Sequence, residues 1–415
     1  MSSLDDQIKA FLYFGYLPHV PEGVELEPWA EPRNEFYDPE LSSLSEDELI
    51  ERGVVALQAP YRDLDPNETY VVSLSGGLDS RSILGGLINA GLKDNIVTVT
   101  YGTPGTYDFD IGKQISKQMG LKHELIDLTT VTLEQSFFES VAASVDSWFW
   151  LFDAYFIRHM TKKMGSKPIY MSGHVGDDLG GAYIPKEAST TWHDAQTRFI
   201  KRNRFVKSIK LAPEGYDPRS YLPAEPILGN SILDYDDQIH LIPRQEGYIR
   251  KLLLPVGLRH VTPFTNREWE RFILSVPRHY RQKLYLYEKI LLKAYPDLFQ
   301  IRIKGKKGLK LDAPEWQLMC KSVVNRSKLI LGDLFPGGNW SINPNLNYID
   351  FENGIRNRPD LKEIVSTNVQ ALKARGVVSW IDIDRLWKMH LNSDANYSDA
   401  LTLLTSLELH LKKLD

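Results

Sequence analysis

Residues 75–80, with the sequence SGGLDS, combine the side chains and the backbone freedom that phosphate binding requires. The two glycines carry no Cβ, so their backbone N–H groups can point at an anion without steric hindrance. The two serines add hydroxyl donors, and the Asp79 carboxylate can hold a Mg²⁺ ion that bridges phosphates. No Gly-Lys-Ser/Thr follows, so this is not a Walker loop. We interpret residues 75–80 as a phosphate-binding loop.

The segments on either side place this loop at the N-terminus of a helix. Residues 70–74 (YVVSL) are mostly β-branched or aromatic, which predicts a buried parallel strand. After the loop, apolar residues recur at helical spacing until Gly91, which ends the predicted helix. The helix dipole adds partial positive charge at the loop. A tight turn without a ligand would explain a bare Gly-Gly pair, but the whole string between a strand and a helix favours phosphate binding.

The rest of the chain predicts an α/β fold. Strands alternate with helices after the loop, which indicates a parallel sheet with helices on both faces. Ligands of such sheets bind beyond the C-terminal ends of the strands. We expect strands at 96–100, 125–128 and 168–172, and helices at 4–14, 45–57, 108–119, 133–145, 151–164 and 398–414, with Ser45 and Glu48 forming a capping box.

A second polar loop follows the predicted strand 168–172. It is rich in glycine and contains the adjacent carboxylates Asp177 and Asp178. Adjacent carboxylates repel each other unless a cation lies between them, and beside a triphosphate Mg²⁺ is the expected cation. A solvated acidic turn is the alternative. Because this loop falls at the same sheet edge as residues 75–80, the sequence favours a shared nucleotide and metal site.

Composition excludes several classes of protein. The 415 residues are 42% hydrophobic and 25% charged, which is typical of a globular protein. The net charge of −5 gives no electrostatic argument for nucleic acid or an anionic membrane as a partner. Cys320 is the single cysteine, so no disulfide forms within the chain. No signal peptide or membrane-spanning segment is visible, and we expect a cytoplasmic protein.

Together, the two loops resemble the synthetase domain of the asparagine synthetase superfamily, which has an ATP-pyrophosphatase fold of the adenine nucleotide α-hydrolase type. β-Lactam synthetases and lasso-peptide cyclases are relatives. The resemblance runs from about residue 10 to about residue 310 and is strongest in the two loops. Further similar segments are Gly102–His123, Arg259–Phe264, Glu288–Lys293 and Arg302–Lys304.

The resemblance implies roles for residues at matching positions. A fixed cation at the reacting centre would stabilise the charge that develops there. The implied cofactors are ATP and Mg²⁺. The implied roles are backbone contacts of Leu74 and Tyr101 with adenine, pyrophosphate binding by Ser75, Gly76, Gly77 and Ser80, nucleotide contacts of Ser172 and Gly173, Mg²⁺ binding by Asp79 and Asp177 assisted by Asp178, and catalysis by Lys304.

The chain departs from the family at its N-terminus. Amidotransferase members carry a glutaminase domain whose nucleophile is the cysteine after the initiator Met, whereas Ser2 follows Met1 here. We therefore expect no glutamine hydrolysis by this chain. Nitrogen would then come as ammonia from solvent or from a separate glutaminase partner, or as an amine, and a carrier partner is a further alternative.

Two further departures concern candidate catalytic residues. The asparagine synthetases have Glu where this chain has His174, and β-lactam-forming relatives have a Tyr that helps to deprotonate the attacking nitrogen. A His at this position can act as a base near neutral pH, or it can simply hydrogen-bond the loop. Lys306, Lys307 and Lys310 crowd Lys304. Which of these lysines reaches the site stays open, and a solvated basic loop is the alternative for the others.

We predict three parts of the chain and one leading function. Residues 1–60 form a connector or remnant, 61–310 the synthetase domain, and 311–415 a helical C-terminal extension packed on it. Residues 184–250 border the acceptor pocket.

The leading function is an ATP-dependent amide-forming ligase that activates a small-molecule or peptide carboxylate as an acyl-adenylate for transfer to ammonia or an amine. The alternatives are an intramolecular amide cyclase of the β-lactam or lasso-peptide type, and a nucleotide-binding partner subunit without activity.

Overall fold

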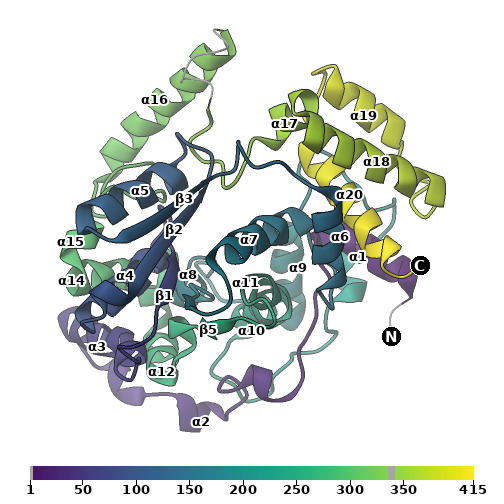
Figure 1. The fold of residues 1–415 in the computed structure, drawn as a ribbon. Coiled ribbons are helices and arrows are strands. Elements are labelled where there is room, and N and C mark those ends of the chain that lie inside the picture. The colour runs from purple at the N-terminus through teal and green to yellow at the C-terminus, as the bar shows by residue number, and fades with distance from the viewer. Residues whose placement is uncertain (1–2, 335–341) are drawn as a thin grey trace.

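A parallel sheet organises the molecule, as Figure 1 shows for the computed structural model. The structure describes residues 3–334 and 342–415; Ser2, whose identity matters for the nitrogen source, lies outside them. Within the described residues the sheet has the order β3-β2-β1-β4-β5, and all its neighbouring strands are parallel. The predicted α/β fold is thereby confirmed. The strands are β1 (Tyr70–Ser73), β2 (Ile96–Gly102), β3 (Lys122–Asp127), β4 (Ile169–Met171) and β5 (Arg259–Val261).

The strand order creates a crevice beside β1. From β1 the chain moves outward through β2 and β3, then returns to place β4 on the other side of β1. The connections that leave β1 and β4 therefore run to opposite sides, and the space between them at the carboxyl edge is the usual ligand position of an open α/β sheet. Both loops that the sequence singled out, 75–80 and 172–178, begin at this crevice.

Helices cover both faces of the sheet. On one side lie α3, α4, α5 and α14, and on the other lie α6, α7 and α20 (Figure 1). The helices are α1 (Leu4–Phe14), α2 (Arg33–Phe36), α3 (Glu46–Gln58), α4 (Asp79–Asn89), α5 (Tyr107–Met119), α6 (Gln135–Ala143), α7 (Leu151–Met164), α8 (Gly176–Gly180), α9 (Trp192–Asn203), α10 (Tyr235–His240), a π-helix (Leu241–Ile249), α11 (Arg250–Leu253), α12 (Arg267–Ser275), α13 (Arg278–Arg281), α14 (Tyr285–Ala294), α15 (Pro296–Phe299), α16 (Glu315–Leu334), α17 (Phe351–Asn357), α18 (Pro359–Arg375), α19 (Ile383–Leu391) and α20 (Ser398–Lys412).

The alternation of side chains along β1 divides the interior into two cores. Val71 belongs to the core that contains α1, α6, α7, α18 and α20, whereas Tyr70 and Val72 belong to the core with α3, α4, α12 and α14. Successive side chains of a strand point to opposite faces, so one short strand anchors both cores. Helix α1 and the C-terminal helices α18 and α20 share the first core with the sheet, whereas residues 26–57 contribute to the second.

Most predicted elements agree closely with the structure. The helices 4–14 and 151–164 have the expected bounds, and the Ser45–Glu48 capping box is present at the start of α3. Strand β5 was not predicted, because its sequence, Arg259-His260-Val261, is not an apolar run of the kind that indicates a buried strand. The loop after β4 contains the one-turn helix α8, which the sequence did not indicate.

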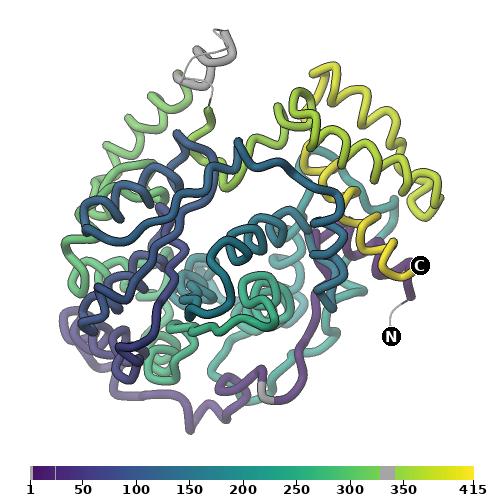
Figure 2. The backbone as a smooth tube through the Cα atoms, in the orientation of Figure 1, coloured from purple at the N-terminus to yellow at the C-terminus, as the bar shows by residue number. Residues whose placement is uncertain are grey.

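The C-terminal helices are part of the main body. Figure 2 shows that both ends of the described chain lie on the same side of the molecule. Helix α1 packs into the same core as α18 and α20. Helix α16, by contrast, stands away from the body (Figure 1). No helix among residues 3–334 and 342–415 is long and apolar enough to cross a membrane.

Because α20 lies in the shared core, truncating a buried leucine there should destabilise the whole fold. Leu404 is fully buried, and we expect Leu404→Ala to lower the free energy of unfolding by about 2–5 kcal/mol. Leu414, 58% exposed just beyond the end of the helix, provides the matched control, and Leu414→Ala should change stability little. Denaturant titration of both variants measures the difference. Equal, small effects would mean that α20 does not contribute to the cooperative core.

Candidate active site

Hydrogen bonds from the backbone to its two serine hydroxyls fix the shape of the predicted phosphate loop. The Gly77 N–H donates to Ser75 Oγ at 3.1 Å, and the Ser75 N–H donates to Ser80 Oγ at 3.2 Å. At Gly76, a Cβ would lie 3.0 Å from the Lys304 Cβ and 3.2 Å from a backbone oxygen of Tyr107, so a side chain has little room there. No side chain caps the N-terminus of α4, which leaves its first N–H groups available to a phosphate.

Asp79 joins the two loops. Its carboxylate accepts the Asp177 N–H at 3.2 Å and the Tyr287 hydroxyl at 2.9 Å. A Cβ on Gly176 would lie only 2.5 Å from the Asp79 Cγ, so glycine at 176 is what lets the second loop approach. The sequence motif predicted both loops, and the structure brings them into direct contact.

The three carboxylates of this junction differ electrostatically. Burial, together with the charge of Asp177, holds the pKa of Asp79 well above its usual value. Burial, with the charge of Asp178 added, raises the pKa of Asp177 to about 6. Burial acts in the same direction on Asp178. The hydrogen bond from His240 Nε2 to Oδ1 at 2.6 Å, together with the charges of His240, Arg244 and His174, outweighs it and lowers the pKa of Asp178. Without a cation nearby, simultaneous ionisation of Asp79 and Asp177 is therefore energetically unfavourable.

This arrangement fits a Mg²⁺ ion that binds together with a nucleotide. Among the described residues, no group of three or more His, Cys, Asp or Glu side chains is arranged to hold a metal by itself. Mg²⁺ usually takes one or two carboxylates and completes its shell with phosphate oxygens and water, so a complete protein cage is not required. Asp79 and Asp177 would supply those carboxylates, whereas Asp178 is already bonded to His240.

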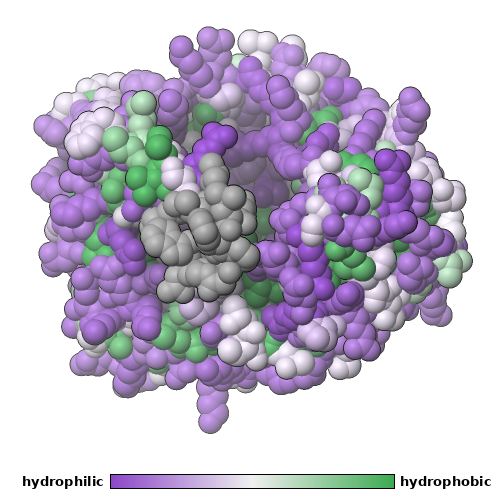
Figure 3. Space-filling view, turned by 90° about the horizontal axis from the view of Figure 1, so that it is seen from above, coloured by the Kyte–Doolittle hydropathy of each residue, from purple (hydrophilic) through white to green (hydrophobic). Residues whose placement is uncertain are grey.

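A cavity of about 250 Å³ lies at the carboxyl edge beside β1 and β4. Ile157, Met160 and Thr161 of α7 form part of its wall. Figure 3, which looks down from the top of Figure 1, shows that the molecule is hollowed near the middle of that face. The predicted nucleotide-binding residues that line the cavity are Ser75, Asp79, Ser80, Tyr101, Ser172 and Gly173.

Leu74 does not line this cavity, and its backbone groups form hydrogen bonds within the sheet. Its N–H donates to the Val99 carbonyl at 2.8 Å, and its carbonyl accepts the Thr100 hydroxyl at 2.6 Å. Its N–H is therefore committed to the sheet, and only the second lone pair of its carbonyl oxygen is left for a nucleotide.

Lys304 reaches the phosphate loop through both its backbone and its side chain. Its N–H donates to the Gly76 carbonyl at 2.9 Å, and its Nζ donates to Asp108 at 2.5 Å and to Asn347 at 2.7 Å. Asp108 also accepts the Gly76 N–H, at 3.1 Å. The neighbouring lysines bind elsewhere: Lys306 contacts Glu288, Lys307 contacts Ser322, and Lys310 contacts Gln300.

Arg81, which the sequence analysis did not single out, fixes the segment that carries Lys304. Its guanidinium is fully buried and donates to the carbonyls of Arg302 at 2.6 Å, Ile301 at 3.1 Å and Gly76 at 3.4 Å. Burial lowers the pKa of Arg81 to about 9. One side chain therefore ties the phosphate loop to residues two and three positions before Lys304.

His174 is buried and forms an ion pair or hydrogen bond with a glutamate that sequence reasoning missed. His174 Nε2 lies 2.8 Å from Glu246 Oε1, and the side chains are 1% and 5% exposed. His174 Nδ1 has no hydrogen-bond partner among the described residues. Glu246 lies in the π-helix, 72 residues along the chain, and no local pattern marks it. The sequence indicated only that residues 184–250 border the site.

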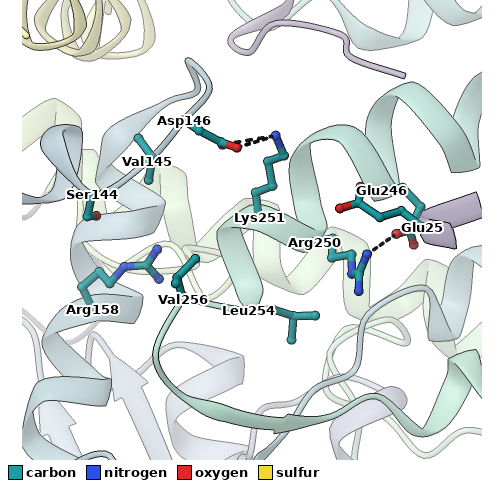
Figure 4. Close-up of a pocket in the computed structure, with 10 residues that line it drawn as sticks. All are labelled: Glu25, Ser144, Val145, Asp146, Arg158, Glu246, Arg250, Lys251, Leu254 and Val256. Atoms are coloured by element: carbon teal, nitrogen blue, oxygen red, sulfur yellow. Dashed lines mark hydrogen bonds and ion pairs between the residues drawn. The ribbon is translucent and has the colours of Figure 1, made fainter. Parts of the chain in front are cut away.

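Glu246 also borders a second cavity, of about 390 Å³, whose lining shares no residue with the first (Figure 4). Its opposite carboxylate oxygen lies 3.4 Å from the Arg250 guanidinium, and Lys251 pairs with Asp146 at 3.1 Å across the same cavity. Glu246 therefore lies between buried His174 and a space that solvent can enter.

The sheet order and the paired loops define an α/β protein whose candidate site lies at the carboxyl edge of its parallel sheet. The asparagine synthase family model matches residues 61–231, so this part of the chain is similar to asparagine synthase domains. The match contains both loops, Asp79 and His174, whereas Lys304 and Glu246 lie beyond it. A search of curated proteins finds no match to the chain.

We expect Asp79→Asn and Asp177→Asn each to weaken Mg²⁺-dependent ATP binding roughly tenfold or more, because each removes a charge that would face the metal–phosphate complex. Titration with a fluorescent ATP analogue, with and without Mg²⁺, measures this. Asp94→Asn, on an exposed turn after α4, is the matched control. Mg²⁺-dependent binding that matches the wild type in either site variant would remove that residue from the metal site.

Proposed function

We propose that this protein is an ATP-dependent amide-forming ligase. In this proposal, a substrate carboxylate attacks the α-phosphorus of ATP, pyrophosphate leaves, and an acyl-adenylate forms. Ammonia or an amine then attacks the acyl carbon, the amide bond forms, and AMP leaves. The observation that carries the proposal is the contact of Asp79 in the phosphate loop with the backbone of Asp177 in the second loop.

The chain's own residues suit the first half of this reaction. The uncapped N–H groups at the start of α4 would bind the departing pyrophosphate, with the hydroxyls of Ser75 and Ser80 beside them. The N–H groups of Ser75, Gly76 and Gly77 are instead bonded within the protein, to Ser80, Asp108 and Ser75, which differs from the expectation that the two glycines point their N–H groups at the anion. Bound Mg²⁺ would neutralise charge on the phosphates. Lys304 Nζ, held by Asp108 and Asn347, provides a fixed positive charge beside the loop that stabilises charge developing in the transition state.

The His174–Glu246 pair suits the second half. An amine must lose a proton to attack or soon after, and a neutral imidazole can accept one. Glu246 orients the His174 ring through Nε2, which leaves Nδ1 as the nitrogen without a partner. The charge of Glu246 would stabilise the imidazolium that results. The same pair favours intramolecular amide closure as the second candidate function, because a dedicated base suits an amine tethered to the acyl group.

The nucleotide products distinguish this proposal from ordinary phosphoryl transfer. With a carboxylate that serves as substrate, we expect ATP to yield AMP and pyrophosphate in equal amounts. Product analysis by ion-exchange chromatography measures both. Formation of ADP and phosphate as the products would contradict the proposal.

A variant of His174 should separate the two half-reactions. We expect His174→Gln to preserve exchange of pyrophosphate into ATP and to slow amide formation roughly a hundredfold or more, because only the second step needs the base. Glu246→Gln should do the same to a smaller degree. His193→Gln, on the exposed face of α9, is the control. Equal losses in both half-reactions would rule out the base role and leave His174 as a structural residue.

A further inference from the structure

Arg158, in the middle of α7, is a half-buried cation without an anionic partner. Its Nη1 is buried and has no hydrogen-bond partner among residues 3–334 and 342–415. Burial lowers the pKa of Arg158 to about 10, and no carboxylate near it opposes this effect. The guanidinium therefore still carries its charge near neutral pH. A buried charged donor without an acceptor is costly, and an anion bound there would remove that cost.

Arg158 lies where two cavities meet. One is the cavity of about 390 Å³ that Glu246 borders, and the other is a third cavity, of about 420 Å³. Both volumes are in the usual range of small-molecule sites. The residues that line both cavities are Ser144, Arg158 and Val256. A ligand in either cavity can therefore reach the Arg158 guanidinium.

The other cations of the 390 Å³ cavity are already paired. Arg250 and Lys251 lie 3.4 Å and 3.1 Å from carboxylate oxygens. The remaining carboxylate of the lining, that of Glu25, is exposed to solvent. Figure 4 shows the Arg158 guanidinium directed into the space that these side chains surround. Its charge is the one that this cavity leaves for an anionic ligand.

The third cavity is positively charged. Arg158 and Lys162 line it, and no carboxylate does. Lys162 follows Arg158 by one helical turn on the same side of α7, and its Nζ lies 5.4 Å from the centre of the Phe137 ring. The hydroxyls of Ser140 and Ser144 already donate to backbone carbonyls at 2.8 Å. The two cations are therefore the strongest donors that remain for a ligand.

These donors suit a carboxylate on an apolar body. A guanidinium presents two parallel N–H groups that match one carboxylate, whereas a phosphate dianion has a third oxygen and more charge to satisfy. Much of the remaining wall is apolar and consists of Phe137, Val141, Pro255, Val256 and Leu258. The ligand class that fits this lining is an organic acid rather than a small inorganic anion.

The site is distinct from the nucleotide cavity. Helix α7 forms a wall of both, since Ile157 and Met160 border the nucleotide cavity and Arg158 and Lys162 border the third one. Thr161 borders both. A ligand at Arg158 would therefore occupy a different space from ATP, with α7 between them.

We propose that Arg158 and Lys162 form a binding site for an organic carboxylate with an apolar body, separate from the nucleotide site. The guanidinium holds the carboxylate, the ammonium adds a second positive charge, and the apolar wall contacts the body of the ligand. This inference does not depend on the proposed reaction. Ordered water is the competing occupant, and it would satisfy Nη1 without any preference for an anion.

A matched pair of probes tests the charge preference. 4-Phenylbutyrate and 4-phenylbutyramide have nearly the same shape, but only the first carries a negative charge. Calorimetric titration of the full chain measures the affinity for each probe. We expect 4-phenylbutyrate to bind roughly tenfold or more tightly, because only it accepts charge-assisted hydrogen bonds from the guanidinium. Arg158→Gln should abolish the preference. The control Lys163→Gln, which removes a cation of α7 that faces Glu124 instead of the cavity, should retain it.

The opposite results overturn the site. They are equal affinities of the wild type for the two probes, binding of neither probe, or a preference that survives in Arg158→Gln. Competitive displacement of 4-phenylbutyrate by α,β-methylene-ATP with Mg²⁺ would place the probe in the nucleotide cavity and contradict a separate site. Tighter binding of phenyl phosphate than of 4-phenylbutyrate would contradict the carboxylate class. The comparison of probes on the wild type needs no variant and therefore does not depend on how a variant folds.

Discussion

The contact between Asp79 and the backbone of Asp177 is the constraint on which the candidate site depends. It joins the connection that leaves β1 to the connection that leaves β4, where the strand order reverses. Gly176 makes the approach sterically possible, and Tyr287 holds the carboxylate from α14. Neither loop alone would form a closed cradle. Open α/β sheets generally bind ligands at their carboxyl edge, and in this protein the two joined loops form a specific pocket there.

Charge is distributed unevenly around this junction. Asp178 receives a hydrogen bond from His240, and Lys304 is held by Asp108, so these groups have partners within the protein. Burial and neighbouring negative charges, in contrast, raise the pKa of both Asp79 and Asp177. The protein therefore satisfies the charges that position the site and leaves unsatisfied those that a metal–nucleotide complex would neutralise.

The sequence predicted the parts of the site that are local. Residues 75–80 and 172–178 follow strands directly, so strand, turn and helix signals within about twenty residues suffice to recognise them. Arg81 was missed although it is adjacent to the loop, because its two shortest hydrogen bonds reach carbonyls more than two hundred residues away. Glu246 was missed for the same reason: a glutamate in a helical segment carries no local sign of the histidine that it meets.

The hydrogen bonds of Lys304 have a consequence for how the protein is made. Gly76, Asp108, Lys304 and Asn347 form one connected group, yet they leave the ribosome in that order, with most of the chain between the first and the last. Domains generally fold from the N-terminus during synthesis, so β1 to β4 can pair early while the lysine still lacks its final partner. Asn347 is the last of the four to be synthesised, so the group of residues that holds Lys304 is complete only late in translation.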